Sequence, residues 1–309
     1  MKYFNYSTVN EIILCGFPNL QDFHLLLFSI LLLAYLFIIT GNVLIFIVVL
    51  REPSLHTPMY FFIRALCIME ICYTAVTIPK MLGNLLYNEK MSLNGCILQA
   101  YFLHALGASE CYLLTIMAYD RYLAICSPLH YPSIMNSKLS IQCVVGCFIT
   151  GFLSPVIETI VIAHLPFCGL NTIQNVFCDF PPLIGLACTD TRLYILVEFV
   201  VSSFIILLTF FFVLLSYIRI IHVVLKIQSK TGRQKAFSTC GAHLVVVILF
   251  FGSITFMYLR LTKSYSEDYD RGVGLTYVVF TPLANPVIYG LRNQEIKRTL
   301  HKYLHFQGT

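Results

Sequence analysis

Long stretches without a charged side chain constrain this chain more than any other feature. A helix crosses the apolar core of a bilayer with about 20 mainly apolar residues, whereas a membrane strand needs only about ten. Stretches near or above the longer length predict transmembrane helices rather than strands. Five stretches contain no Asp, Glu, Lys or Arg: Leu25 to Leu50, Leu139 to Ile157, Phe199 to Ile218, Ala236 to Leu259 and Gly272 to Leu291.

Two further apolar stretches, residues 58–86 and 93–126, carry a few charges. The interrupting residues are Arg64, Glu70, Lys80 and Glu110, with Asp120 and Arg121 close to the end of the second stretch. Only 11% of all residues are charged and the mean hydropathy is +0.79, whereas about a quarter of a soluble domain is charged. We therefore expect an all-α membrane protein, a bundle of seven transmembrane helices.

The expected organisation is a single domain over residues 1–309. Residues 1–22 contain Glu11 and Asp22 and lack a basic start followed by an apolar run, so we expect no cleavable signal peptide. Residues 292–309 form a cytoplasmic tail with a short amphipathic helix. The helices are expected at about 23–50, 58–86, 93–126, 139–163, 193–227, 233–260 and 271–291.

Basic residues set the expected orientation. With the N-terminus outside, twelve basic residues lie on the cytoplasmic side and six on the opposite side, as the positive-inside rule favours. Topology and contact with anionic lipid account for the net charge of +5, so no nucleic-acid partner is expected. Asn5-Tyr6-Ser7 is the only N-glycosylation sequon and lies on the expected extracellular side.

The cysteines divide between the two sides of the membrane. Those in or near helices are read as small packing residues, and Cys15 has no assigned role. The extracellular side is oxidising, so cysteines there can pair. Four of them allow three connectivities, and their spacing does not choose among these. These four are Cys96, Cys168, Cys178 and Cys188.

Motifs along most of the chain resemble those of the rhodopsin-like G-protein-coupled receptors, and more closely those of the odorant receptors, with the tetrapod (class II) branch nearest. They include a cysteine at the start of the third span and a long loop with three cysteines after the fourth. The others are Gly41-Asn42, LHTPMYFF at 55–62, MAYDRYLAIC at 117–126, SYIRI at 216–220, KAFSTCGAHL at 235–244 and PLANPVIYGLRN at 282–293.

The resemblance implies a function. Such a receptor binds a small, mainly apolar volatile odorant within the helix bundle. It then activates a stimulatory olfactory-type heterotrimeric G protein and raises cyclic AMP, in the plasma membrane of olfactory neuron cilia. The resemblance also implies the disulfides Cys96–Cys178 and Cys168–Cys188. A rhodopsin-like receptor for a non-odorant small molecule, or an odorant-type receptor outside the nose, remains an alternative that the sequence does not separate.

A G-protein switch is expected at the inner end of the third span. A charge near the membrane core is costly unless it is paired or hydrated, so Asp120 is expected to hold Arg121 until activation frees it. Pro286 removes a backbone hydrogen bond and gives the seventh helix a place to bend. The alternative is a charge pair that only anchors a helix end. The expected switch residues are Asp120, Arg121, Tyr122, Tyr217, Asn285, Pro286 and Tyr289.

Glu70 and Glu110 interrupt membrane spans, and an ionisable residue there indicates a functional site. Two facing carboxylates cannot both stay charged without a cation or a shared proton. With Asn42 nearby, they predict a sodium site or a proton-sharing pair. The family usually has Asp in place of Glu70, and the extra methylene of Glu changes how the carboxylate can coordinate an ion. A neutral glutamic acid that links helices by a hydrogen bond therefore has nearly equal weight. Arg64 also departs from the family pattern, and no cofactor beyond the sodium ion is expected.

A ligand site is expected on one face of the third span, where His104, Gly107, Ala108 and Cys111 recur at helical spacing. By resemblance this face and its neighbours line the odorant site, although ordinary packing explains several members equally well. Leu103 stands where amine receptors carry an aspartate, so a dedicated pocket for a cationic amine is not expected. Glu158 and Glu198 are acidic residues that leave this question open. The expected set is Leu103, His104, Gly107, Ala108, Cys111, Glu198, Ser202, Ile205, Ile206, Ile254, Thr255, Tyr258, Leu275 and Val278.

Other classes of membrane protein fit less well. No internal repeat suggests a transporter, and Gly272 to Leu291 has no lysine to hold retinal. No nucleophile with a base and no His-Glu-x-x-His pattern suggests an intramembrane enzyme.

Overall fold

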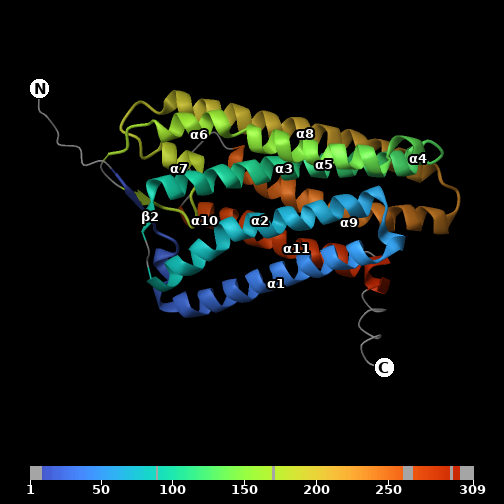
Figure 1. Ribbon diagram of the computed structural model, residues 1–309, viewed down its shortest axis with the longest axis horizontal. Coiled ribbons are helices and arrows are strands. Elements are labelled where there is room, and N and C mark those ends of the chain that lie inside the picture. Colours follow the sequence, from blue (N-terminus) through green and yellow to red (C-terminus); the bar gives the residue numbers. More distant parts are fainter. Residues whose placement is uncertain (1–8, 88–89, 169–170, 260–266, 293–294, 300–309) are drawn as a thin grey trace, which may run out of the picture.

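The computed structural model describes residues 9–87, 90–168, 171–259, 267–292 and 295–299. Its long helices run nearly parallel and form an elongated bundle, with β2 at one end and α4 at the other (Figure 1). The expected all-α bundle is confirmed. Among the described residues, six spans are long and apolar enough to cross a membrane, and α3 (Leu93–Cys126) is a further long helix.

The long helices begin and end close to the expected residues. They are α1 (His24–Arg51), α2 (Pro58–Tyr87), α3, α5 (Ser137–Leu153) with α6 (Val156–Ala163), α8 (Arg192–Lys226) and α9 (Lys230–Tyr258). The last pass comprises α10 (Glu267–Leu275), η3 (Thr276–Phe280), α11 (Thr281–Val287) and η4 (Ile288–Arg292). Short elements join them: η1 (Pro18–Phe23), η2 (Pro53–Leu55), α4 (Tyr131–Ile134) and α7 (Phe180–Ile184). Residues 295–299 of the tail are also helical.

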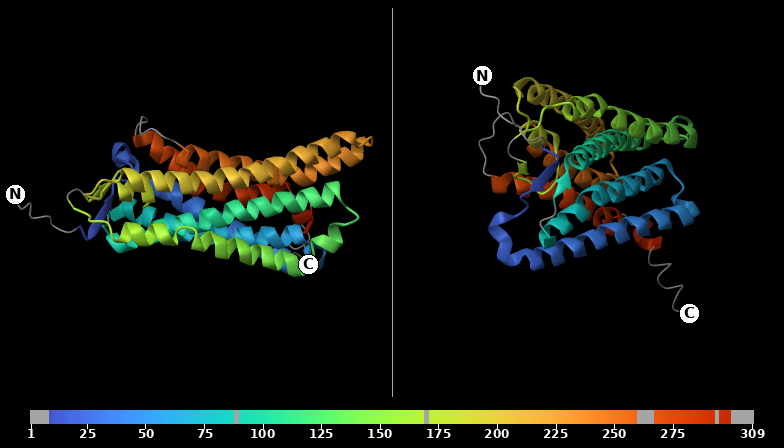
Figure 2. Two further views of the ribbon diagram at one scale, coloured as in Figure 1. Left: turned by 90° about the horizontal axis from the view of Figure 1, so that it is seen from above. Right: turned by 60° about the vertical axis from the view of Figure 1, so that its left-hand side comes forward.

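Helix α3 packs against α2, α5 and α8 in the middle of the bundle (Figure 2). Several of its polar residues, among them Gln99, Ser109 and Glu110, are buried. Because these side chains meet other helices rather than lipid, α3 can be less apolar than the helices around it.

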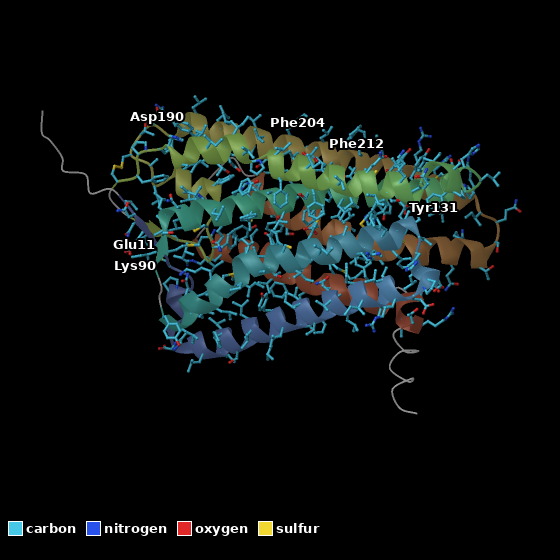
Figure 3. The ribbon with its side chains drawn as sticks, in the orientation of Figure 1. Glu11, Lys90, Tyr131, Asp190, Phe204 and Phe212 are labelled. Carbon is cyan, nitrogen blue, oxygen red and sulfur yellow. A yellow bond between two sulfur atoms is a disulfide. The ribbon has the colours of Figure 1, made fainter. Side chains whose placement is uncertain are left out.

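Helix α8 shows the opposite pattern and turns large apolar side chains outward. Phe204 and Phe212 point away from the bundle (Figure 3), and Phe204 is 65% exposed. Leu25 and Leu33 of α1 are also exposed. A wide apolar outer surface is what a bilayer requires, whereas a soluble monomer rarely exposes one.

The fourth span is broken, contrary to the expectation of one helix over residues 139–163. Helix α5 ends at Leu153 and α6 begins at Val156. Pro155 has no N–H and its ring clashes with the preceding turn, so the helix cannot run through it unchanged. The Thr159 hydroxyl donates to the Pro155 carbonyl at 2.7 Å, and Glu158 lies one turn past the break.

The last pass also differs from the expected regular helix over 271–291. It begins earlier, at Glu267, and contains the two π-helical turns η3 and η4. Each π turn adds a residue to the helical repeat and rotates the face that follows. Pro286 of α11 lies against α1 so closely that a Cβ on Gly41 would be 2.7 Å from the Pro286 Cβ.

A small sheet and two disulfides cover the end of the bundle at which α3 begins. Strand β1 (Glu11–Leu14) pairs antiparallel with β2 (Met91–Ser92) and parallel with β3 (Thr172–Ile173). Cys96 of α3 is joined to Cys178, with Cα atoms 5.3 Å apart, and Cys168 to Cys188, at 5.8 Å. Lys90 and Glu11 form an exposed ion pair at 2.9 Å beside the strands (Figure 3).

The first disulfide is expected to matter more for folding than the second. Cys96 and Cys178 are fully buried and close a separation of 82 residues, whereas Cys188 is exposed and its bridge closes 20. Loss of a native disulfide typically costs about 2–5 kcal/mol, more for longer loops. We expect the double variant Cys96→Ser, Cys178→Ser to reach the cell surface several-fold less than Cys168→Ser, Cys188→Ser, measured by surface antibody labelling. Equal surface levels would contradict this ranking.

Candidate functional site

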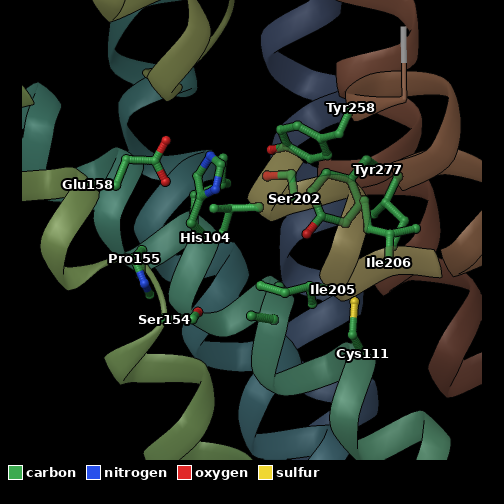
Figure 4. A pocket seen from close by; sticks show the side chains of 15 residues that line it. His104, Cys111, Ser154, Pro155, Glu158, Ser202, Ile205, Ile206, Tyr258 and Tyr277 are labelled. Carbon is green, nitrogen blue, oxygen red and sulfur yellow. The ribbon is translucent and has the colours of Figure 1, made fainter. Parts of the chain in front are cut away.

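A cavity of about 50 Å³ lies between α3, the α5–α6 break, α8, α9 and η3 (Figure 4). Most of the side chains expected to contact a ligand meet here. They are Leu103, His104, Gly107, Ala108 and Cys111 from α3, Ser202, Ile205 and Ile206 from α8, and Ile254 and Tyr258 from α9. The lining is apolar at Cys111, Ile205 and Ile206 and polar at His104, Glu158 and Ser202 (Figure 4).

Four residues of the expected set do not line the cavity. Thr255 is exposed on α9, Leu275 is half-buried and Val278 is fully buried elsewhere in the bundle. Glu198 is buried one turn before Ser202, whose hydroxyl donates to the Glu198 carboxylate at 3.0 Å. Glu198 therefore acts on the cavity through Ser202.

Five lining residues were not in the expected set. Tyr277, which lies inside the π turn η3, lines the cavity where Leu275 and Val278 were expected. Ser154, Pro155 and Glu158 face the cavity because the fourth span breaks there. Of these, only the helix break had a signal in the sequence, a proline inside an apolar span. The five are Ser154, Pro155, Glu158, Val201 and Tyr277.

His104 is held by the loop between α6 and α8. Its Nε2 donates to Asp179 Oδ1 at 2.7 Å, and its ring stacks on Phe180 with centroids 4.2 Å apart. Asp179 also caps α7 by accepting from the Phe180 amide at 2.9 Å, and Tyr258 donates to it at 3.5 Å. The adjacent Cys178 is bonded to α3, so the disulfide fixes the carboxylate that orients His104.

At the other end of α3, Asp120 and Arg121 form a buried ion pair. Asp120 is fully buried, and Arg121 donates to its carboxylate. The hydroxyl of Tyr131 in α4 donates to the second carboxylate oxygen at 2.8 Å. Burial and the neighbouring Asp120 carboxylate raise the pKa of Tyr131, so its phenol stays protonated and can donate.

Among the described residues, Tyr122, Tyr217 and Tyr289 make no hydrogen bond to Arg121, whereas Asn285 bonds to Glu70 and Pro286 packs against Gly41 of α1. Tyr217 Oη lies 2.7 Å from His243 Nδ1 and donates to the Cys240 carbonyl at 3.3 Å, which links α8 to α9. Tyr289 is 1% exposed, and its hydroxyl has no hydrogen-bond partner among the described residues. Tyr122 is half-buried, and Tyr119 stacks on it. His243 was not singled out from the sequence, although it lies in KAFSTCGAHL.

A third cluster lies between these two sites, where Glu70 and Glu110 interact with each other. Asn285 Nδ2 donates to Glu70, which connects α2 to α11. Asn42 donates to the Ile38 carbonyl of its own helix at 2.9 Å. Glu110 Oε1 and Asn285 Oδ1 are buried without a partner among the described residues. Both are acceptors, so the cluster fits a cation or a shared proton.

Comparison with known proteins decides the family. A family model described as "Olfactory receptor" matches residues 31–306. The chain is 54% identical to human olfactory receptor 6N1 over 301 residues, which cover 97% of this chain and 96% of that protein. It is 48% identical to human olfactory receptor 6K6 (98% and 88% covered) and 44% identical to rat olfactory receptor 226 (96% and 92%). This chain belongs to the olfactory receptor family.

Membership of the olfactory receptor family relates the three clusters, around His104, Arg121 and Glu70, to one receptor function. Olfactory receptors are rhodopsin-like G-protein-coupled receptors, multi-pass membrane proteins that detect odorants and signal through G proteins, and they are not enzymes. This olfactory receptor therefore carries a candidate ligand cavity and a candidate switch at opposite ends of one helix, α3.

Three sequence observations stand apart from these clusters. Asn5, the expected glycosylation site, lies outside the described residues. Arg64 lies over the rings of Phe46 and Phe61, at 5.3 and 5.8 Å from their centroids. Cys15 is a half-buried free thiol beside a large outer cavity between the N-terminal segment and α2.

His104→Leu is expected to weaken the response of this olfactory receptor to its ligand. The change nearly keeps the volume but leaves Asp179 with only Tyr258 and the Phe180 amide, and a lost charge-assisted hydrogen bond costs about 1.5–3 kcal/mol. We expect the half-maximal odorant concentration to rise at least about tenfold. His164→Leu is the matched control, because His164 is exposed outside the cavity. Equal responses of the two variants at equal surface level would exclude this role of His104.

Proposed function

We propose that this olfactory receptor takes a small, mainly apolar volatile ligand into the cavity and activates a stimulatory olfactory-type heterotrimeric G protein, which raises cyclic AMP. Its place is the plasma membrane of olfactory neuron cilia, with the N-terminus extracellular. The observation that carries the proposal is the layout of α3. His104 and Cys111 line the cavity, and Arg121 is held by Asp120 toward the other end of the same helix.

Activation is a shift between two arrangements of the bundle. A ligand shifts a population only by as much as its affinities for the two arrangements differ. It contacts α3, α8 and α9 together, so it can favour an outward position of α9. That motion stretches the link between Tyr217 and His243 and opens the inner end, where Arg121 leaves Asp120 and meets the G protein.

Tyr289 supports this direction of change. A buried hydroxyl without a partner is costly, and Tyr289 has none among the described residues. An active arrangement in which Tyr289 and Tyr217 turn toward Arg121 supplies partners. Pro286, three residues earlier, gives the chain its place to bend.

The cluster of Glu70, Glu110 and Asn285 stabilises the resting arrangement. A bound sodium ion would be held by the acceptor oxygens of these three residues, and it would supply the positive charge that the two carboxyl groups lack. A proton shared by Glu70 and Glu110 does the same without an ion. In both cases the Asn285 bond to Glu70 ties α11 to α2.

The test is cyclic AMP in cells that express the chain, challenged with a broad odorant panel beside an Arg121→Ala variant at matched surface level. We expect a ligand response that the variant loses. A response that survives equally in Arg121→Ala would overturn the switch. Silence to odorants with surface expression shown, and a response to a non-odorant small molecule, would favour the alternative ligand class.

A further inference from the structure

The polar end of the cavity is acidic. Glu158 lines it directly beside His104 (Figure 4), and no Lys or Arg is among the lining residues. Asp179 and Glu198 stand just behind, through their bonds to His104 and Ser202. The three carboxyl groups are close enough for their charges to interact. One imidazole therefore faces three carboxyl groups.

Among the described residues, the internal bonds leave one carboxyl oxygen of these groups, Glu158 Oε1, without a hydrogen-bond partner. His104 is already bonded to Asp179 at 2.7 Å, and Glu198 accepts from Ser202 at 3.0 Å. Glu158 Oε1 is buried and has no hydrogen-bond partner among the described residues. A buried acceptor without a donor is destabilising, and more so if the group is charged. A donor from outside the chain removes that cost.

A cationic donor fits better than a neutral one. A nearby positive charge favours the ionised form of a carboxyl group, and neighbouring negative charges oppose it. A hydroxyl supplies a hydrogen bond but leaves the repulsion among the three groups. An ammonium group supplies both the hydrogen bond and the charge, and its hydrogen bonds to a carboxylate are roughly twice as strong as neutral ones.

We propose that the ligand of this receptor is a small aliphatic amine, bound as the ammonium ion with an N–H group directed to Glu158. Its alkyl part lies against Cys111, Ile205 and Ile206. The proposal rests on the function proposed above and names its ligand class. From the sequence, Leu103 in place of an aspartate argued against an amine pocket. In the structure the acidic groups come from other elements: Glu158 from α6, Glu198 from α8 and Asp179 from the loop before α7.

The size of the cavity limits the amine. About 50 Å³ corresponds to roughly three to five water molecules at the ~10–15 Å³ that one water needs. Isobutylamine is of this size, and isobutanol and isopentane have equal numbers of non-hydrogen atoms with nearly the same shape. The amine is charged at neutral pH, as a lysine side chain with a pKa of about 10.4 is.

The experiment compares these three compounds in buffered medium by cyclic AMP in cells that express the receptor. We expect isobutylamine to act at a concentration at least about tenfold lower than isobutanol, and isopentane to be weakest, since a charge-assisted bond contributes about 1.5–3 kcal/mol. Glu158→Gln should raise the half-maximal isobutylamine concentration at least tenfold and leave that of isobutanol nearly unchanged. Asp22→Asn, which removes an exposed acidic charge outside the bundle, should change neither.

A second measurement needs no variant and therefore still tests the proposal if Glu158→Gln does not reach the cell surface. Isobutylamine should raise the melting temperature of the purified receptor more than isobutanol does at the same concentration, because a ligand stabilises the state that it binds. Equal or greater potency of isobutanol in cells, or an amine-to-alcohol ratio unchanged in Glu158→Gln, would overturn the proposal. So would silence to all three compounds while other odorants act, which leaves the odorant-receptor function standing. Silence to every odorant would overturn both.

Discussion

Gly151→Ala is expected to remove most of the folded receptor from the cell surface. A Cβ at this position of α5 would lie 2.0 Å from Ser109 Oγ, 2.7 Å from Ser109 N and 2.8 Å from its Cα. The serine hydroxyl can rotate away, but the backbone of α3 cannot yield without moving the helix. Overpacking of this kind costs typically about 1–3 kcal/mol and occasionally more.

Gly146→Ala on the same helix is the matched control, because nothing lies within 4 Å of its added Cβ. Alanine is favoured over glycine inside a helix by about 0.5–1 kcal/mol, so this variant should be as stable as the parent or slightly more so. Surface labelling and the melting temperature of purified protein measure the difference. Two variants of equal stability would show that α3 and α5 do not approach as closely as described.

Asp120→Asn is expected to raise signalling without ligand. Arg121 is buried with Asp120 as its bonded carboxylate, and a hydrogen bond to a charged group contributes about 1.5–3 kcal/mol. Without that restraint the active arrangement gains population, and basal cyclic AMP should rise about tenfold or more at matched surface level. The same loss leaves a buried charge less well paired, so the protein should also be less stable.

Tyr131→Phe tests the same restraint more gently. It removes only the bond at 2.8 Å to Asp120, which is worth about 0.5–1.5 kcal/mol, so basal cyclic AMP should rise a few-fold. Tyr119→Phe is the matched control, since Tyr119 is exposed. If basal cyclic AMP stays at the parental level in both Asp120→Asn and Tyr131→Phe, the buried pair is an anchor for the helix end and not a switch.

Regular features of the fold could be predicted from the sequence because a bilayer imposes them. The bounds expected for α1, α2 and α8 from the apolar stretches lie within a residue or two of those observed. Helical spacing brought His104 and Cys111 to one face of α3. Local departures from regular helix could not be placed in this way. Tyr277 lines the cavity in place of Leu275 and Val278 and lies in the π turn η3, which a periodicity of 3.6 residues does not predict.

Contacts between segments far apart in the chain were also not predicted from the sequence. Strand β1 pairs with two short strands far away in sequence, and four residues carry too little pattern to predict that. In the sequence, Glu158 and Glu198 left an amine pocket open, but nothing there placed Glu158 beside His104. The place of Glu158 in the cavity depends on the break at Pro155, and the polarity of the cavity depends on Asp179 arriving from the loop.

Nucleotide exchange by purified components tests most directly whether Arg121 couples this receptor to a G protein. The receptor in lipid nanodiscs is mixed with a stimulatory olfactory-type G protein, and the rate of GTP-analogue binding is followed with and without the odorant that acts in cells. We expect the ligand to increase this rate in the parent receptor and not in Arg121→Ala, although that variant still binds the ligand. An exchange rate that does not change with ligand, or that rises equally in Arg121→Ala, would contradict it.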